Sequence, residues 1–503
     1  MRKAFDHVVI GGGSGGLSCA NRLAELGRRV ALFDFVTPSE TRGTQWGFGG
    51  TCVNVGCIPK KLFHDAGELA LESREKAKAF GLSPFSTNHD WNALRQTVQN
   101  HVKSLSFQYS KVHPNVTLIR AQAKLRADKT VEYEEQDFFG DSGVETKSIE
   151  AKHSVVLACG GRPSLPPDVK GASEFGITSD DIFSLKESPG KILCVGGSYV
   201  GLEVAGFLSS LGYETHLAVR SRVLKGDGFD SDCADKVLQL LQYRAGCIVH
   251  LKTVPRSITA VGSKHKYRVE LVSDGKILHQ EFDTVFFGTG RHVDFSFANG
   301  LDIEKTKGGK IQVDPISYET SVSGVFAIGD MANTGMPELT PVAVMQGELL
   351  AERLSNFQPT KISFGGLGVP SAVFTPTEYA RVGYSELAAQ NQFGVDNVET
   401  YLMDWKTLDS AATATGHHEC FAKLVCLKSD ETVVGVHFVG PRAGELMQGY
   451  SLAVNKGITK QDFKRYCLGI HPTNSEALID LRISRSSGED FVQTGGCAGG
   501  RCG

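Results

Sequence analysis

Residues 5–35 read FDHVVIGGGSGGLSCANRLAELGRRVALFDF, and this stretch predicts a strand, a glycine turn, a helix and a second strand. The glycines of such a turn let backbone N–H groups at a helix N-terminus approach a pyrophosphate. Asp34 lies 23 residues after Gly11, where a carboxylate accepts hydrogen bonds from ribose hydroxyls. The segment therefore predicts a dinucleotide site, although a glycine-rich turn without a ligand is an alternative. The predicted contacts are Gly11, Gly13, Ser14, Gly15, Gly16 and Asp34.

A second copy of the pattern occupies residues 191–220, KILCVGGSYVGLEVAGFLSSLGYETHLAVR. Its turn residues are Gly196, Ser198 and Gly201. The position equivalent to Asp34 is Val219, and the cations that follow it are Arg220, Arg222 and Lys225. Loss of the acid and gain of cations suit a ribose 2′-phosphate, so this half predicts NADPH in preference to NADH. The alternative is a solvated basic loop.

Two cysteine pairs share one spacing, Cys52 and Cys57 in GTCVNVGCIPKK and Cys497 and Cys502 in GGCAGGRCG. The first pair follows the nucleotide motif and is a candidate redox dithiol, with buried structural thiols as the alternative. No further CxxC or histidine cluster completes a zinc ligand set, so we expect no metal. The glycine-rich second pair is either an accessible dithiol, with Arg501 favouring the Cys502 thiolate, or an incidental tail.

The segment IHPTNSEAL at residues 470–478 contains His471 and Glu476. An imidazole oriented by a carboxylate is suited to proton transfer in thiol–disulfide exchange, and the alternative is a surface histidine. Together with the cysteine pairs, this predicts electrons passing from a cofactor to a buried dithiol and then to a mobile one.

Composition narrows the class of protein. A length of 503 residues is enough for about three domains. A net charge of −3 gives no support for nucleic-acid or membrane partners, and no long apolar run is present. MRKAFDHVVIGGG is already a strand and its turn, so we expect no targeting peptide in this chain and a cytoplasmic location, unless a presequence has been removed.

The remaining pattern predicts helices over 63–111 and a strand meander over 116–160. VFFGTGR (285–291) and GVFAIGD (324–330) both read as strand–glycine units of the first nucleotide fold. Residues 369–480 alternate strands with helices and predict a third domain, and the Ser- and Gly-rich tail from Ser484 is expected to be mobile.

Taken together, GTCVNVGCIPKK, GVFAIGD, ELTPVAV and IHPTNSEAL resemble the pyridine nucleotide–disulfide oxidoreductases. The chain is most similar to high-molecular-weight thioredoxin reductases of the apicomplexan type, which end in a CxxxxC pair. The resemblance implies an α/β protein with two Rossmann-like domains, a C-terminal α+β dimerisation domain and a flexible tail. The implied division is 1–163 and 292–368 for FAD, 164–291 for NADPH, 369–485 for the interface and 486–503 for the tail.

The resemblance also implies roles for single residues. Cys57 corresponds to the thiol that faces the flavin, and Cys52 to the interchange thiol. Lys60 corresponds to a lysine near the flavin that pairs with Glu203. The other implied cofactor contacts are Thr51, Tyr199, Gly290, Arg291, Asp330, Leu339 and Thr340, with Arg220 and Lys225 at the 2′-phosphate positions.

The implied reaction carries electrons from NADPH through FAD and Cys52–Cys57 to the partner subunit's Cys497–Cys502 and then to thioredoxin. In this homodimer the partner subunit's His471 and Glu476 complete the active site. Glutathione reductase is the main alternative, but Asn21 and Glu348 stand where that family has arginines for the glutathione carboxylates. A FAD-binding signalling module is the alternative from outside the enzymes.

Overall fold

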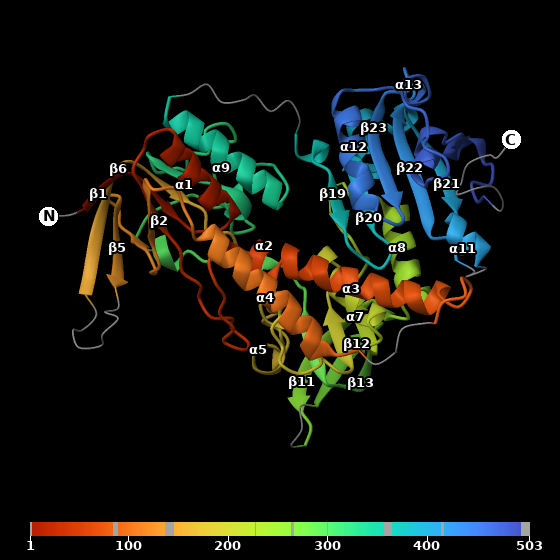
Figure 1. Ribbon diagram of the computed structural model, residues 1–503, viewed down its shortest axis with the longest axis horizontal. Helices are drawn as coiled ribbons and strands as arrows, with labels where there is room; N and C mark the ends of the chain where they lie inside the picture. The colour runs from red at the N-terminus through yellow and green to blue at the C-terminus, as the bar shows by residue number, and fades with distance from the viewer. Residues whose placement is uncertain are drawn as a thin grey trace.

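The computed structural model describes residues 3–83, 89–135, 145–226, 228–262, 266–298, 300–356, 365–413 and 417–493. Figure 1 shows two α/β units and a C-terminal unit around a long central helix. The predicted fold class, two Rossmann-like domains and a C-terminal dimerisation domain, is confirmed. Within the described residues, no helix combines the length and apolar character needed to cross a bilayer.

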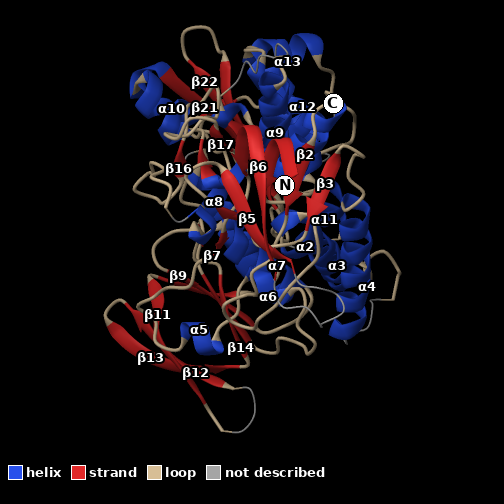
Figure 2. Cartoon of the chain, turned by 90° about the vertical axis from the view of Figure 1, so that its left-hand side faces the viewer, coloured by secondary structure: helices blue, strands red, loops and turns tan. Residues whose placement is uncertain are grey.

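The first nucleotide fold is a seven-stranded sheet. Strand β1 (Lys3–Ile10) pairs in parallel with β2 (Val30–Phe33) on one side and with β6 (Glu145–Leu157) on the other. Its other strands are β3 (Val116–Ile119), β4 (Lys124–Leu125), β5 (Thr130–Glu135) and β17 (Val325–Ala327). Helix α1 (Ser14–Glu25) packs on the sheet and on α9 (Thr340–Leu354). Figure 2 shows β5, β6, β2 and β3 of this sheet.

The second nucleotide fold has a four-stranded parallel sheet of β10 (Ile248–Leu251), β9 (Thr215–Val219), β8 (Ile192–Val195) and β14 (Thr284–Phe287). Helices α7 (Tyr199–Ser210) and α8 (Ser231–Tyr243) belong to this unit. An antiparallel sheet of β11 (Thr253–Ala260), β12 (Tyr267–Ser273) and β13 (Lys276–Phe282) lies beside it.

The assignment of VFFGTGR to the first fold was wrong, whereas that of GVFAIGD is confirmed. Strand β14 pairs with β8 in the second sheet, and β17 pairs with β6 in the first. Both strands are apolar and precede glycines, so the local sequence does not distinguish them. Their sheets are chosen by long-range pairing, which the strand sequence alone does not specify.

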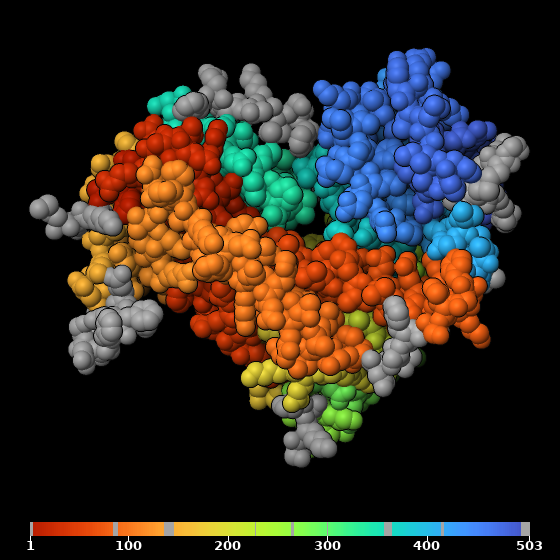
Figure 3. Space-filling model, in the orientation of Figure 1, coloured from red at the N-terminus to blue at the C-terminus, as the bar shows by residue number. Residues whose placement is uncertain are grey.

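Three helices form the connection after the first motif. They are α2 (Gly50–Val55), α3 (Cys57–Lys76) and α4 (Trp91–Tyr109), so the helical prediction for 63–111 is confirmed for two separate helices. Figure 1 shows α3 running from the first fold to the C-terminal unit. It packs closely on α7, because a Cβ added at Gly67 would lie 3.0 Å from the Ser210 side chain. The space-filling view shows the sheet region of the first nucleotide fold and the C-terminal unit above α3 and α4 (Figure 3).

The C-terminal unit is a six-stranded sheet of β19 (Ser371–Val373), β20 (Tyr379–Gly383), β23 (Val433–Val439), β22 (Cys420–Leu427), β21 (Val398–Trp405) and β24 (Ile483–Ser484). Its helices are α10 (Glu386–Phe393), α11 (Leu408–Ala412), α12 (Ala443–Asn455), α13 (Lys460–Tyr466) and α14 (Ser475–Ile479). Buried Trp405 stacks on Phe438 with ring centroids 5.9 Å apart, and this contact lies in the core.

The tail does not leave the fold at Ser484 as expected. Strand β24 pairs with β21, Val492 forms a bridge with Asp404, and Gln493 donates its N–H to the Asp404 carbonyl at 2.8 Å. Backbone hydrogen bonds therefore hold the segment up to residue 493 against the sheet edge. A Ser- and Gly-rich composition does not reveal pairing of this kind, because main-chain groups make the bonds.

A buried ion cluster joins the second nucleotide fold to the C-terminal unit. Lys423 of β22 is fully buried, and its Nζ lies 2.8 Å from Asp230, 3.0 Å from Asp232 and 2.5 Å from Glu386. Burial by itself raises the pKa of Asp230, but the charges of His437 and Lys423 outweigh it and hold that pKa at about 2. The lysine thus balances carboxylates from two domains.

The substitution Lys423→Met is expected to destabilise the protein by about 3–5 kcal/mol, because it leaves buried carboxylates without a cation. A lower thermal unfolding midpoint at neutral pH is the measurement. The stabilisation from Asp230 is present above its unfolded pKa and is lost as pH falls toward about 2, so the difference between variant and wild type should shrink in acid.

Lys124→Met is the matched control. Lys124 forms an ion pair with Glu134 at 3.2 Å, and both side chains are about half exposed. Such pairs contribute roughly 0–1 kcal/mol. Equal effects of the two substitutions would contradict the role given to the buried cluster.

Candidate functional site

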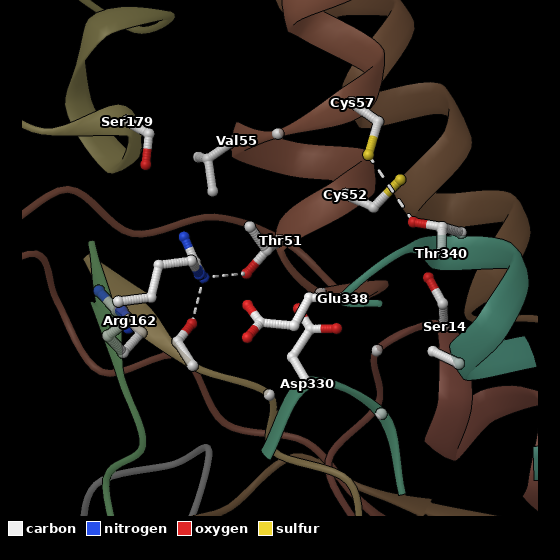
Figure 4. Close-up of a pocket in the computed structure, with 18 of the residues that line it drawn as sticks. Ser14, Thr51, Cys52, Val55, Cys57, Arg162, Ser179, Asp330, Glu338 and Thr340 are labelled. Atoms are coloured by element: carbon white, nitrogen blue, oxygen red, sulfur yellow. Dashed lines mark hydrogen bonds between the residues drawn. The ribbon is translucent and has the colours of Figure 1, made fainter. Parts of the chain in front are cut away.

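A cavity of about 1520 Å³ lies where the three units meet. Figure 4 shows part of its wall. The sequence-predicted residues that line it are Gly11, Gly13, Ser14, Gly15, Asp34, Thr51, Cys52, Cys57, Lys60, Tyr199, Glu203, Arg291, Asp330, Leu339 and Thr340. Those that do not line it are Gly16, Gly196, Ser198, Gly201, Arg220, Arg222, Lys225, Gly290, His471 and Glu476. The structure therefore unites the first motif, the first cysteine pair and the start of α7.

The first glycine motif is shaped for a phosphate group. Gly11 has φ +112°, and a Cβ on Gly16 would lie only 1.9 Å from the Gly11 carbonyl oxygen. No side chain caps the N-terminus of α1, which leaves its first amides available to an anion. The Gly12 N–H donates to Asp34 Oδ1 at 3.0 Å, and burial raises the pKa of Asp34 to about 6. These residues fit a dinucleotide whose ribose meets Asp34.

The second motif has the same turn geometry as the first, but it is followed by basic side chains in place of an acid. Gly196 has φ +126°, and the Ser198 hydroxyl donates to the Gly288 carbonyl at 3.0 Å. The helix α7 also begins without a side-chain cap. The cations Arg220, Arg222 and Lys225 are exposed and form no ion pair with any described residue. This end of the site fits a ligand that carries an additional phosphate.

Acidic and basic groups face each other on another wall of the cavity. Asp330 and Glu338 lie close together in Figure 4. Burial raises the pKa of Asp330, and the charge of Glu338 raises it further. Arg291 donates to Thr51 Oγ1 at 3.4 Å and to the Gly161 carbonyl. This wall offers hydroxyl, carboxylate and guanidinium groups to a polar ligand.

The first cysteine pair is at the junction of two helices. Cys52 lies in α2 and Cys57 is the first residue of α3, and both have free thiols. Hydrogen bonding from Cys52, then the Thr340 hydroxyl and the Lys60 charge, lower the pKa of Cys57 to about 6 against the effect of burial. The same thiol contact and burial raise the pKa of Cys52. Of the two thiols, Cys57 is therefore the one whose ionisation its surroundings favour.

A buried ion pair stands beside the cysteines. Lys60 Nζ lies 2.9 Å from Glu203 Oε1, which also accepts the Phe374 N–H at 2.9 Å. The Lys60 ammonium lies 3.8 Å from the centre of the Phe374 ring. The predicted pairing of Lys60 with Glu203 is thus present, and Phe374 of the C-terminal unit fixes it from the other side.

His471 and Glu476 form a pair away from this cavity. His471 Nδ1 lies 3.1 Å from Glu476 Oε1, and the imidazole is about half exposed. Neither residue lines the cavity of the same chain. Cys497 and Cys502 lie outside the described residues. Within the described part of one chain, the predicted acid–base pair is therefore separate from Cys52 and Cys57.

Sequence reasoning missed three groups in the cavity wall, Glu338, Arg162 and Phe374. Glu338 lies in the ELTPVAV segment just before α9 begins. A polar residue at a helix start was a signal that sequence reasoning could have used. Arg162 donates to Asp180 at 3.1 Å and lies 4.8 Å from the Trp46 ring centre. Phe374 comes from another domain, so no local pattern indicates it.

One cluster has atoms placed as metal ligands, although we expected no metal. The ligand atoms of His64, Asp65 and Glu68 lie within 4.8 Å of one another. The Lys61 ammonium is bonded to Asp65. This cluster on α3 thus already contains a cation supplied by the chain.

Thr340→Val should raise the pKa of Cys57, because it removes a hydroxyl whose Oγ1 lies 3.7 Å from Cys57 Sγ. A rise of about one pKa unit would reduce the thiolate at pH 7 from about nine-tenths to about half. Rates of alkylation of the reduced protein, measured from about pH 4 to about pH 9, give the titration directly. Thr340→Ser keeps the hydroxyl and should titrate like wild type, and identical profiles for both variants would contradict the assignment.

Comparisons with known proteins agree with this geometry. The family model "Pyridine nucleotide-disulphide oxidoreductase" matches residues 5–347, and its "dimerisation domain" matches 369–482. The thioredoxin reductase of Plasmodium falciparum (isolate FCH-5) is 42% identical, over 99% of this chain and 92% of the relative. Thioredoxin reductase SEP1 of Emiliania huxleyi is 40% identical over 98% and 99%. The mitochondrial thioredoxin reductase 2 of Drosophila melanogaster is 39% identical over 99% and 94%. The chain therefore belongs to the pyridine nucleotide-disulphide oxidoreductase family.

Proposed function

We propose that this protein uses NADPH to reduce the disulfide of thioredoxin. The observation that carries the proposal is the Cys52 and Cys57 pair, with its low-pKa thiol, in the wall of a cavity that also contains the first glycine motif and the start of α7. A dithiol beside one nucleotide motif and the first residues of the helix that follows the other is suited to convert hydride equivalents into thiols. The names of the relatives favour thioredoxin as the substrate.

The first motif, with Asp34 and Asp330, would hold FAD, and the second motif with Arg220 would hold NADPH. FAD bound there would supply the electron transfer between the nicotinamide and the Cys52–Cys57 disulfide. The chain's own contribution beside the cysteines is Lys60, which keeps a positive charge near Cys57 and is held in place by Glu203.

The second step is exchange with the CxxxxC tail of the other chain in a homodimer. Cys52 transfers its proton to the partner subunit's His471 and attacks the partner subunit's Cys497–Cys502 disulfide, and a new sulfur–sulfur bond forms as the tail bond breaks. Cys57 then attacks Cys52, which restores the Cys52–Cys57 disulfide and releases the tail as two thiols. The reduced tail repeats the exchange on thioredoxin, a substrate too large for the cavity.

Each departing sulfur needs a proton. The partner subunit's His471 would donate it, with its carboxylate neighbour holding the imidazole in orientation. In one chain the imidazole is half exposed and the pair lies outside the cavity, which is consistent with service to a site on the other chain. The dimerisation-domain match supports this arrangement.

Glutathione disulfide is the second candidate, and the geometry disfavours it. Glu348 is exposed on α9, where Ser18 donates to it at 3.4 Å. The Asn21 side chain accepts the His113 N–H at 3.1 Å. An exposed carboxylate at this place repels the carboxylates of glutathione. A purely FAD-binding signalling role would leave the paired thiols beside the nucleotide motifs without use.

The substitution Cys502→Ser tests the tail. We expect NADPH oxidation with thioredoxin disulfide to fall by at least about 10³-fold, because the tail disulfide no longer forms. NADPH should still generate the Cys52 and Cys57 thiols, counted by alkylation. Normal thioredoxin turnover in this variant would contradict the relay and make a small disulfide the leading substrate.

The substitution Arg220→Ala tests the nucleotide preference. The Michaelis constant for NADPH should rise about tenfold, because a charged contact to the 2′-phosphate is lost, and that for NADH should change little. Arg256→Ala removes another exposed arginine of the same unit and is the control. Equal effects of Arg220→Ala on both nucleotides would reject the 2′-phosphate assignment.

A further inference from the structure

Arg381 of β20 is a buried cation that has no counter-ion among the described residues. The residue is only 5% exposed, and its Nε and Nη1 atoms are buried without a hydrogen-bond partner. It forms no ion pair within the described part of the chain, and its guanidinium lies 5.3 Å from the Phe229 ring centre. Burial lowers the pKa of this guanidinium. A buried charge in this state is costly unless an anion joins it.

A second unsatisfied donor lies directly opposite. Ser371 pairs with Arg381 across β19 and β20, and opposed residues in an antiparallel pair project to the same face. The Ser371 hydroxyl is also buried without a partner. Both residues line the cavity described above. Two hydrogen-bond donors therefore converge on one place in its wall.

The loop that follows the exposed cations ends against this place. Gly226 and Phe229 line the same cavity, and a Cβ on Gly228 would lie 2.2 Å from Arg381 Nη1. Asp230 follows directly but is already bonded to Lys423 at 2.8 Å and 2.9 Å. No carboxylate of the described chain therefore neutralises Arg381, which leaves its charge to a ligand.

The position of Arg381 indicates which ligand group it takes. The cavity that Arg381 lines is also lined by Tyr199 and Val200, the first residues of α7. Arg220 and the other exposed cations stay outside the cavity, so the 2′-phosphate has its own partners. The anionic group of NADPH that remains is the diphosphate. FAD also carries a diphosphate, but the first glycine motif is the proposed binding site for that group.

We propose that Arg381 and Ser371 bind the diphosphate of the nicotinamide dinucleotide, as a contact from the C-terminal unit added to the glycine motif of the second fold. This inference rests on the proposed function, because it requires a dinucleotide in that half of the cavity. The dinucleotide would join the two domains through Arg381. Its diphosphate would supply the negative charge that no described carboxylate provides for Arg381.

The test is isothermal titration of the FAD-loaded protein with NADP⁺ and with NAD⁺. Arg381→Met should weaken both nucleotides by about tenfold or more, because both contain the diphosphate. Arg220→Ala should weaken NADP⁺ alone. Arg381→Lys, which keeps the charge but not the planar donor geometry, should recover part of the affinity, and Ser371→Ala should lose less than Arg381→Met.

Thermal unfolding gives a readout independent of activity. Without nucleotide, Arg381→Met should unfold at the wild-type temperature or above it, because it removes an unpaired buried charge. The rise in unfolding temperature that saturating NADP⁺ gives wild type should shrink in the variant. An unfolding temperature well below wild type would mean that Arg381 is structural and would overturn the inference.

The other outcomes separate the inference from the proposed function. Unchanged dissociation constants in Arg381→Met, or weakening of NADP⁺ alone, overturn the diphosphate contact and leave NADPH binding intact. Loss of flavin absorbance in the purified variant would assign Arg381 to FAD instead. If wild type binds neither nucleotide, the proposed function fails and this inference fails with it.

Discussion

The carboxylate of Glu203 joins the three parts of this protein. It accepts a hydrogen bond from Lys60 of α3 and another from the backbone of Phe374 in the C-terminal unit, and it belongs itself to α7. A buried carboxylate is stable only when its partners are in place, so the ion pair fixes the helix that begins at Cys57. The position of Cys52 and Cys57 therefore depends on both other domains.

Other junctions between the units are also made by buried ions. Arg244, the residue that follows α8, lies 2.9 Å from Glu75 and 3.5 Å from Glu419, and Lys423 holds its carboxylates near the other end of that helix. Ion pairs of this kind contribute little net stability but are intolerant of displacement, because an unpaired partner is costly. They fit an arrangement in which the cavity wall comes from several domains. Arg381 is the exception, since no described carboxylate meets it.

Much of the fold follows from local pattern. The glycine motif, the strand Val30–Phe33 and the helix starting at Ser14 are recognisable because close backbone approach requires glycine at Gly11 and Gly16. Sheet membership was less predictable. β14 and β17 have similar sequences but pair with different sheets, and residues up to Gln493 are held by main-chain bonds that composition does not reveal. Long-range pairing decides both features.

The sequence by itself determined the chemistry available to this protein: two nucleotide motifs, an acid in one and cations in the other, and two dithiols. Such features are local, since a glycine turn or a cysteine spacing acts through a few neighbouring residues. Only the tertiary structure decided which of the two thiols ionises more readily, because the pKa of Cys57 depends on Cys52, Thr340 and Lys60 together. It also decided that Arg381 meets no carboxylate in the described part of the chain, since a charge is paired or unpaired only through groups that folding brings within about 4 Å.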